Sequence, residues 1–212
     1  MPRRHWPTLA AIALLALCLW RVVPAMRADG HLIYPLDDTY IHMGMAKNLA
    51  LHGTWGMTRY EFSSSSSSPL WTTLLAGAYA TTGLRDSTPL ILNVLCAVAL
   101  LVISDLALTR WTVPPAARAL VLAALVLAVP LPPLVLMGME HVLHLLLSVA
   151  FAVTVLDLLS GPMPPPRGRI VMLCVLAALL GASRYEGFFL VAVASLLLVI
   201  RGQPGAGVVV GL

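Results

Sequence analysis

Long uninterrupted runs of apolar residues limit the folds open to this chain more than any other feature of its sequence. A helix that crosses the hydrocarbon core of a bilayer needs about 20 predominantly apolar residues. On that criterion the sequence predicts spans at roughly 8–26, 88–109, 117–136, 141–160, 170–183 and 187–200, of which the last two are short. Charged residues make up only 10% of the chain, compared with about 25% in soluble domains. We therefore exclude a soluble fold and predict an all-α, polytopic transmembrane helical bundle that forms a single domain over residues 1–212.

The two ends of the sequence predict an uncleaved first span and a longer parent protein. Arg3 and Arg4 precede the first apolar run, but Arg21 and Pro24 stand near its end, where a signal peptide would carry a small-residue cleavage site. The run is therefore expected to stay as a membrane span. A last apolar stretch, 205–212, begins and stops abruptly. We expect the chain to be truncated at residue 212.

The distribution of charge predicts how the spans are oriented. The net charge is +4, but the basic residues are scattered between apolar runs without a basic patch, which excludes nucleic acid as a partner. Short cytoplasmic loops are rich in Lys and Arg, and one set of alternate segments carries Arg3, Arg4, Arg110, Arg118, Arg167, Arg169 and Arg201. This places the N-terminus in the cytoplasm, the protein in the cell (inner) membrane and the long segment 27–87 on its external face.

That orientation depends on residues 69–83, which contain four threonines. The stretch is short for a span and suits an interfacial or re-entrant helix. If it crosses the membrane, every later segment changes sides. We prefer the interpretation that keeps the basic loops in the cytoplasm.

A second interfacial helix is predicted over 37–52 in the external loop. Pro35 disfavours helix before it, Asp37 is a good N-cap and Gly53 is a good residue after the C-terminus. Ile41 and Met45, followed by Leu49, recur every fourth residue as one apolar face. We expect this helix to lie on the outer membrane surface, and the serine tract at 63–68 to be a flexible linker.

Two neighbouring carboxylates, Asp37 and Asp38, begin the predicted helix and admit two interpretations. As capping residues they would each gain about 0.3–1 kcal/mol from the helix dipole. As a functional pair at the membrane surface, one could act as a general base towards a hydroxyl while the other orients it. His42, one turn after Asp38, could hydrogen-bond to it in a supporting role.

The external segments resemble those of the GT-C glycosyltransferases, polytopic enzymes that use lipid-phosphate sugars. The likeness is to bacterial members akin to arabinofuranosyltransferases and protein O-mannosyltransferases, and it covers most of the chain. It rests on DDTYIH at 37–42, AKNLA at 46–50, SPLWT at 68–72, GME at 138–140 and SRYEG at 183–187. The charge distribution independently places all five segments on one face of the membrane. The resemblance implies a GT-C-like fold.

The resemblance also implies a reaction and residues for it. A sugar would move from a polyprenyl-phosphate donor to a hydroxyl of a glycan, lipid or protein acceptor in a single inverting displacement. The base would be a loop aspartate, Asp37 or Asp38, with Asp37 favoured by position. A cation should stabilise the departing phosphate. The residues expected to bind substrate are Lys47, Arg59, Glu140, Arg184 and Glu186.

No cofactor or metal ligand is predicted. His141 and His144 stand at i and i+3 beside Glu140 and could chelate a divalent cation, but interfacial histidines and a helix-terminal Glu are commoner. Cys18, Cys96 and Cys174 each lie inside an apolar run and are predicted to be buried core residues.

The alternative hypothesis is a non-enzymatic membrane protein, either a transporter fragment or a scaffold. Transporters carry ionisable residues within their spans and often repeat an internal half. Here only Asp105 and Asp157 come close, both near span ends, and the sequence shows no repeat. Because the acids gather in the external loop, the sequence favours interfacial chemistry.

Overall fold

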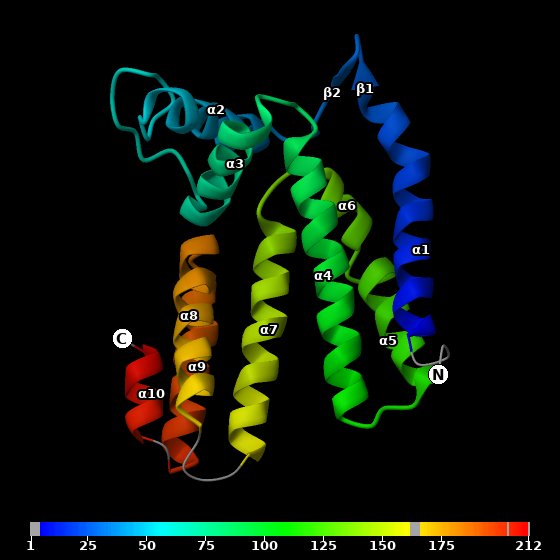
Figure 1. Cartoon of the computed structure of the whole chain (residues 1–212), viewed down its shortest axis with the longest axis vertical. Helices are drawn as coiled ribbons and strands as arrows, with labels where there is room; N and C mark the ends of the chain where they lie inside the picture. Colours follow the sequence, from blue (N-terminus) through cyan, green and yellow to red (C-terminus); the bar gives the residue numbers. More distant parts are fainter. Residues whose placement is uncertain (1–4, 162–165, 203, 212) are drawn as a thin grey trace. The chain divides into compact units, whose positions relative to one another are not determined.

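The computed structural model of the chain describes residues 5–161, 166–202 and 204–211. It is nearly all-α, as predicted, and divides into two compact units, Met1–Leu143 and His144–Leu212 (Figure 1). Arg3, Arg4 and residue 212, which entered the topology argument, lie outside the described residues.

The helices follow the predicted segments closely. The first unit contains α1 (Trp6–Val22), the 3-10 helix η2 (Val23–Met26), α2 (Asp37–His52), α3 (Pro69–Thr82), α4 (Thr88–Arg110), α5 (Pro115–Leu127) and α6 (Leu131–Leu136). Helix α7 (His141–Ser160) begins in the first unit and continues into the second, which also contains α8 (Arg167–Ser183), α9 (Gly187–Ile200) and α10 (Pro204–Gly211).

Among the described residues, three helices are long and apolar enough to cross a membrane: Trp6–Met26, Thr88–Arg110 and His141–Ser160. They support the prediction of a helical membrane protein. The other predicted spans form shorter helices, of which α5 and α9 are also apolar.

The predicted span at 117–136 is divided into two helices. Helix α5 ends at Leu127 and α6 begins at Leu131. Pro130 explains the break, because proline has no amide hydrogen and its ring collides with the carbonyl four residues earlier. Prolines 132 and 133 suit the first turn of α6, where the amide hydrogens have no partner within the helix.

Helices α1, α4, α5 and α6 pack together as the core of the first unit, around buried leucines such as Leu15, Leu100 and Leu122. The connection between α4 and α5 lies at one end of these helices, and the segment holding α2 and α3 lies at the other (Figure 1). The candidate residues of segment 27–87 therefore lie at one end of the first unit (Figure 1).

An antiparallel hairpin, β1 (Arg27–Ala28) and β2 (His31–Leu32), follows η2 and was not predicted. Its two-residue turn is Asp29-Gly30, with φ of 50° and 81°. Asn or Asp followed by Gly is typical of such turns, since both positions need positive φ. The Asp86 carboxylate accepts a hydrogen bond from Leu32 N–H at 2.9 Å and lies 3.3 Å from His31 Nδ1. The hairpin is thereby fixed to the segment that precedes α4.

Helices α2 and α3 pack against each other, and this contact determines which face of α2 is buried in protein. The predicted stripe was Ile41, Met45 and Leu49, but Ile41 and Leu49 are only half-buried. The buried residues are Thr39, His42, Met45, Ala46 and Asn48. The face of α2 that contacts protein therefore differs from the apolar stripe expected at the membrane surface, and it contains small and hydrogen-bonded polar residues besides Met45.

The ends of α2 and α3 confirm part of the capping prediction. Asp37 is the first helical residue of α2 rather than its cap, and the capping residue Leu36 makes no side-chain bond to the helix. Gly53 ends α2 in the left-handed conformation with φ of 67°, as predicted. Ser68 caps α3 by accepting a hydrogen bond from Trp71 N–H.

A buried polar cluster joins α1, α4 and α5 at the end of the first unit that lies away from α2. Asp105 Oδ1 lies 3.2 Å from Arg118 Nη1, and Asp105 Oδ2 accepts a hydrogen bond of 2.7 Å from Thr8. Arg118 also donates to Thr109. Arg118 was expected in a cytoplasmic loop, but it is 2% exposed. It is buried because its guanidinium pairs with a carboxylate of α4.

In the second unit, α8, α9 and α10 pack together. The turn between α8 and α9 ends at Gly187, where a Cβ atom would lie 2.6 Å from the carbonyl oxygen of Leu180. The predicted burial of the cysteines is corrected: Cys18, Cys96 and Cys174 are each half-buried.

Candidate functional site

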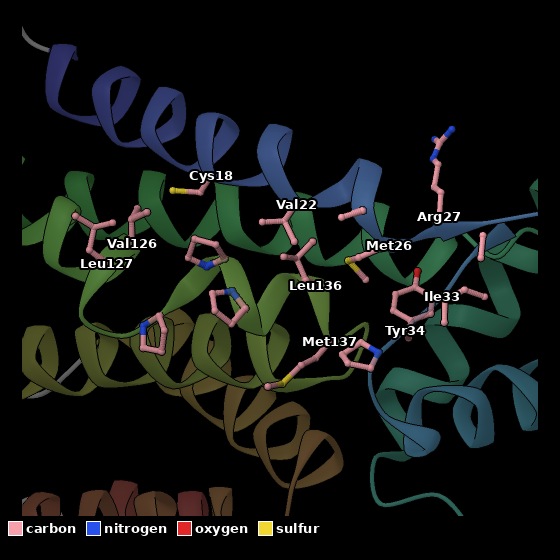
Figure 2. A pocket seen from close by; sticks show the side chains of 16 residues that line it. Cys18, Val22, Met26, Arg27, Ile33, Tyr34, Val126, Leu127, Leu136 and Met137 are labelled. Carbon is pink, nitrogen blue, oxygen red and sulfur yellow. The ribbon is translucent and has the colours of Figure 1, made fainter. Parts of the chain in front are cut away.

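An apolar groove of about 910 Å³ runs along the first unit (Figure 2). One wall comes from α1 and η2, and the other from α5 and the proline-rich α6. The broken helix contributes to it directly, since Pro130, Pro132 and Pro133 all line the groove. The volume lies within the about 300–1,000 Å³ typical of small-molecule sites. An elongated apolar group is the ligand that such a lining favours.

The groove ends in polar residues near α2. Arg27 and Tyr34 line it, together with Pro35 and Met137. Tyr34 is fixed by two hydrogen bonds, since its hydroxyl donates to Asp86 O at 2.7 Å and accepts from Leu90 N–H at 3.1 Å. Burial raises the pKa of Tyr34, so the hydroxyl stays protonated.

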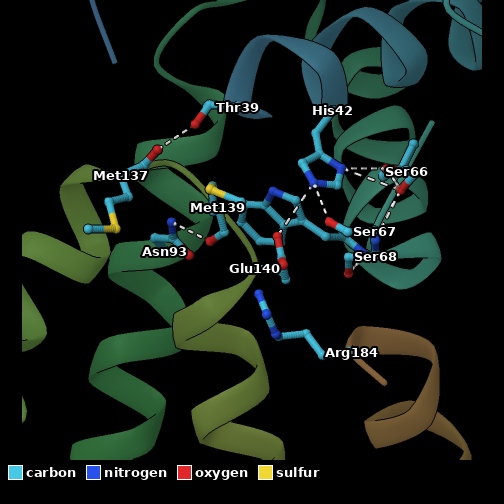
Figure 3. A network of polar contacts seen from close by, with 12 residues as sticks. Thr39, His42, Ser66, Ser67, Ser68, Asn93, Met137, Met139, Glu140 and Arg184 are labelled. Atoms are coloured by element: carbon cyan, nitrogen blue, oxygen red, sulfur yellow. Dashed lines mark hydrogen bonds and ion pairs between the residues drawn. The ribbon is translucent and has the colours of Figure 1, made fainter. Parts of the chain in front are cut away.

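The segment between α6 and α7 connects this end of the groove to α2. Thr39 Oγ1 donates to the Met137 carbonyl at 2.6 Å (Figure 3). Gly138 follows with φ of 73°, and a Cβ atom there would lie 2.6 Å from the Tyr34 ring and 2.8 Å from Thr39 Cγ2. Only glycine lets the backbone pass this close to both side chains. The first turn of α2 is thus held beside the groove.

Asp37 and Asp38 occupy that first turn and are both exposed. Within the part of the chain that the structure describes, neither carboxylate makes a side-chain hydrogen bond or an ion pair. The helix dipole stabilises their charge by about 0.3–1 kcal/mol each. The two carboxylates are therefore accessible at the start of the helix and are not used to cap it.

His42 lies one turn further along α2, in a buried polar network (Figure 3). Its Nδ1 is 3.0 Å from Thr72 Oγ1 and 3.4 Å from Ser66 Oγ. Its Nε2 is 3.4 Å from Ser67 Oγ and 3.5 Å from Glu140 Oε2. His42 therefore joins α2 to α3, to the serine tract and to the residue before α7. The expected hydrogen bond to Asp38 is replaced by these contacts.

The serine tract is consequently more than a linker. Ser66 and Ser67 contact His42, Ser66 Oγ is 2.9 Å from Thr72 Oγ1, and Ser68 caps α3. Their hydroxyl groups supply the short polar contacts that a buried imidazole needs. The sequence carried no periodic signal for these contacts, because they depend on how the loop folds back onto α2.

The other candidates of the first unit lie apart from the two aspartates. Glu140 is completely buried beside His42. Lys47 is exposed nine residues after Asp38 on α2, which corresponds to about 14 Å along the helix axis. Arg59 is exposed and stacks on Tyr60, with its Cζ 4.7 Å from the ring centre. Of these candidates in the described part of the first unit, Glu140 is the one that the structure brings beside His42.

Arg184 and Glu186 lie in the second unit and pair with each other. Arg184 donates from Nε and Nη2 to the two carboxylate oxygens, at 3.2 and 2.8 Å. These bonds lower the pKa of Glu186 to about 2, so this carboxylate remains ionised at neutral pH and does not serve as a proton donor there.

The histidines considered as metal ligands have other contacts. His144 Nδ1 lies 2.8 Å from Ser183 Oγ. Over residues 5–161, 166–202 and 204–211, no three His, Cys, Asp or Glu side chains converge in a way that could hold a metal ion.

Arg27 and Tyr34 are the site residues that the sequence argument overlooked. The position of each residue in the sequence could have indicated a role at the site. Arg27 directly follows the first predicted span, and Tyr34 stands three residues before Asp37. What the sequence lacked was the partner wall of the groove, which comes from residues about 100 positions later.

Comparison with protein-family models, curated proteins and solved structures finds no match. The function proposed below therefore rests on the geometry of this chain and on the resemblance of its loop motifs.

Burial lowers the pKa of His42, although the carboxylates of Glu140 and Asp38 act in the opposite direction and His141 adds to the lowering. The folded chain thus keeps His42 neutral where an unfolded histidine, with an ordinary pKa of about 6.5, binds a proton. We expect the free energy of unfolding to be highest above pH 6.5 and to fall below it, by up to about 1.4 kcal/mol per pH unit.

Thermal unfolding in detergent at pH 7.5 and 5.5 measures this slope. His42→Gln should flatten it, whereas His52→Gln, at the exposed end of α2, should leave it unchanged. Equal slopes in the wild type and His42→Gln would show that His42 does not couple stability to pH.

Proposed function

We propose that this chain is the membrane part of a glycosyltransferase that moves a sugar from a polyprenyl-phosphate donor to an acceptor hydroxyl. One observation carries the proposal: an apolar groove ends beside a helix N-terminus that presents two exposed carboxylates, which form no hydrogen bond or ion pair through their side chains within the described residues. This reaction requires the protein to bind a lipid chain and to provide a group that takes a proton from the acceptor hydroxyl. The loop motifs that resemble GT-C enzymes contain the same carboxylates, and a GT-C-like fold is part of the proposal.

In the proposed complex the polyprenyl tail occupies the groove and its phosphate lies at the groove end. Arg27 borders this end with an exposed side chain that extends away from the groove (Figure 2). Turned towards the groove, its guanidinium would stabilise a phosphate through charge-assisted hydrogen bonds. The sugar attached to the phosphate would then extend towards Asp37 and Asp38. We place this end on the external face of the inner membrane, with the N-terminus in the cytoplasm, in agreement with the charge distribution.

The proposed reaction is a single displacement at the anomeric carbon. One carboxylate of the Asp37–Asp38 pair takes the proton of the acceptor hydroxyl while its oxygen attacks. The bond between the anomeric carbon and the phosphate oxygen breaks, and polyprenyl phosphate leaves with inversion of configuration. The acceptor hydroxyl belongs to a glycan, a lipid or a protein, and no step requires a cofactor.

The remaining candidates take different roles in this proposal. Arg27 lines the groove and Lys47 does not, so we propose that Arg27 stabilises the departing phosphate. Arg184, on the segment that resembles the family, pairs with Glu186 within the second unit and is given no role at the groove. Glu140 supports His42 instead of contacting substrate, because it is completely buried.

The rival hypothesis of a transporter or scaffold has one observation in its favour. Asp105 and Arg118 are both buried between helices, and buried ionisable residues are common in transporters. Their charges, however, satisfy each other at 3.2 Å. A structural ion pair explains them without a transported ion.

A groove-filling substitution tests the enzymatic proposal. Ala25 lines the groove and is exposed to it, so Ala25→Trp should obstruct the lipid tail. Ala10→Trp is the matched control, since Ala10 is also exposed near the other end of α1 and does not line the groove. The assay measures release of polyprenyl phosphate by the protein in liposomes, with a panel of polyprenyl-phosphate sugars.

We expect Ala25→Trp to lower kcat/KM at least tenfold, and Ala10→Trp to change it little. Equal activity of the two variants would remove the groove from the proposal. Absence of turnover by this chain and by a longer form of the protein, over a broad panel, would favour the non-enzymatic hypothesis.

A further inference from the structure

A second, smaller pocket of about 220 Å³ lies between α2, α3 and the segment before α4. Met43, Gly44 and Lys47 contribute from α2, Tyr79 from α3, and residues 84–86 from the segment that leads into α4. Two cationic side chains, Lys47 and Arg85, border this pocket. It shares no lining residue with the apolar groove.

Three hydrogen-bond donors of the pocket have no acceptor in the described chain. Lys47 and Arg85 form no ion pair there, and the Tyr79 hydroxyl forms no side-chain hydrogen bond. Tyr79 is 5% exposed. Burial, followed by the nearby Asp86 charge, raises the pKa of Tyr79 to about 12, so its hydroxyl stays protonated and can donate. Donors from three separate elements therefore border one small space.

Asp86 is the one carboxylate that lines the pocket. Its Oδ2 accepts from Leu32 N–H at 2.9 Å and lies 3.3 Å from His31 Nδ1, and these contacts lower its pKa. Asp86 is therefore ionised and already engaged in fixing the hairpin. With Lys47 and Arg85 both charged, the lining carries a net positive charge.

We propose that this pocket binds a phosphate oxyanion, with Lys47, Arg85 and the Tyr79 hydroxyl as donors. A phosphate group offers several acceptor oxygens and so can engage three donors at once. Its position favours the phosphate of an anionic lipid headgroup. Residues 84–86 lie just before Thr88, the first residue of α4, and α4 is long and apolar enough to cross a membrane. The pocket thus lies where such a helix would meet the headgroup layer.

This site is distinct from the proposed donor site. Lys47 is about 14 Å along α2 from Asp38, and Arg27, not Lys47, lines the end of the groove. The inference does not depend on glycosyl transfer and can be tested on binding alone.

The test uses the full chain in a neutral detergent, with dioctanoyl phosphatidic acid as the probe. Dioctanoylglycerol, which has the same tails without the phosphate, measures binding by the tails. Affinity is determined for the wild type, Lys47→Gln, Arg85→Gln and Tyr79→Phe. Arg59→Gln is the matched control, because Arg59 is exposed in the same loop but stacks on Tyr60 and lines neither this pocket nor the groove, so it has no part in the proposed donor site. Circular dichroism checks that each variant is folded.

We expect the wild type to bind phosphatidic acid more tightly than dioctanoylglycerol, and Lys47→Gln and Arg85→Gln each to weaken this binding about tenfold, as expected for loss of a charged donor. Tyr79→Phe should weaken it by a smaller factor, and Arg59→Gln should have little effect. If Lys47→Gln and Arg85→Gln weaken binding no more than Arg59→Gln does, or if the two lipids bind equally, the inference is wrong.

Inorganic phosphate separates the two possible sources of the anion. Displacement of phosphatidic acid by millimolar phosphate, reduced in Arg85→Gln, would indicate that the pocket recognises a soluble phosphate group. Binding of phosphatidic acid that depends on Arg85 but resists inorganic phosphate would indicate a lipid headgroup. Both outcomes support a phosphate site.

Discussion

Replacing one of the two carboxylates at the start of α2 by its amide is expected to lower kcat by about 10²–10⁴-fold, the usual contribution of a general base. Asparagine keeps the size and polarity of aspartate but cannot take the acceptor proton at neutral pH. We favour Asp37→Asn for the larger loss, by its position in the motif. The other variant should stay within about tenfold of the wild type, as a neighbour that only orients the base. The measurement is release of polyprenyl phosphate in liposomes.

Loss of folding does not explain such a result. Asp37 and Asp38 are exposed, and α2 is not capped by either side chain. Each substitution should therefore cost at most about 1 kcal/mol through the helix dipole. Asp29→Asn is the matched control, because Asp29 is an exposed aspartate of the same segment with φ of 50°, a conformation that asparagine also adopts. Unchanged turnover in both Asp37→Asn and Asp38→Asn would rule out the proposed base.

The second large effect is expected at the buried ion pair of the first unit. Arg118→Met keeps most of the side-chain volume but leaves the Asp105 carboxylate without its charged partner. Removing one member of a buried pair typically destabilises a protein by about 3–5 kcal/mol, because an uncompensated charge remains in a medium of low dielectric constant. We expect the midpoint of thermal unfolding in detergent to fall accordingly.

A double variant distinguishes the destabilisation caused by an unpaired buried charge from the contribution of the ion pair itself to the free energy of unfolding. In Asp105→Leu/Arg118→Met no charge is left buried, so most of the lost stability should return. Arg110→Met is the control for removal of a positive charge, since Arg110 is exposed at the end of α4. If Arg118→Met is no less stable than Arg110→Met, the pair does not contribute to the fold as described.

The sequence predicted the helices well because their signals are local. The bounds of α2, α7 and α9 match the predicted segments 37–52, 141–160 and 187–200. Apolar run length, proline, capping residues and glycine at a left-handed position act within a few residues of one another. A local signal also explains why the predicted span 117–136 is divided. The length of the apolar run predicted one helix, but Pro130 ends the helical pattern, and the break falls at 128–130.

Segment 27–87 and Glu140 lie at one end of the helices, where His42 and Glu140 come within 3.5 Å. The connection between α4 and α5 lies at the other end (Figure 1). The expectation that these segments share one face of the membrane agrees with this arrangement and stays a prediction.

What the sequence by itself determined, then, is a helical membrane protein with one long polar segment that contains two adjacent carboxylates. Only the tertiary structure decided that His42 contacts the serine tract, that Arg118 pairs with Asp105, and that Arg27 and Tyr34 line a groove completed by α5 and α6. These contacts join residues far apart in the chain. No local periodicity encodes them, because they arise only when separate helices pack and each buried polar group must find a partner.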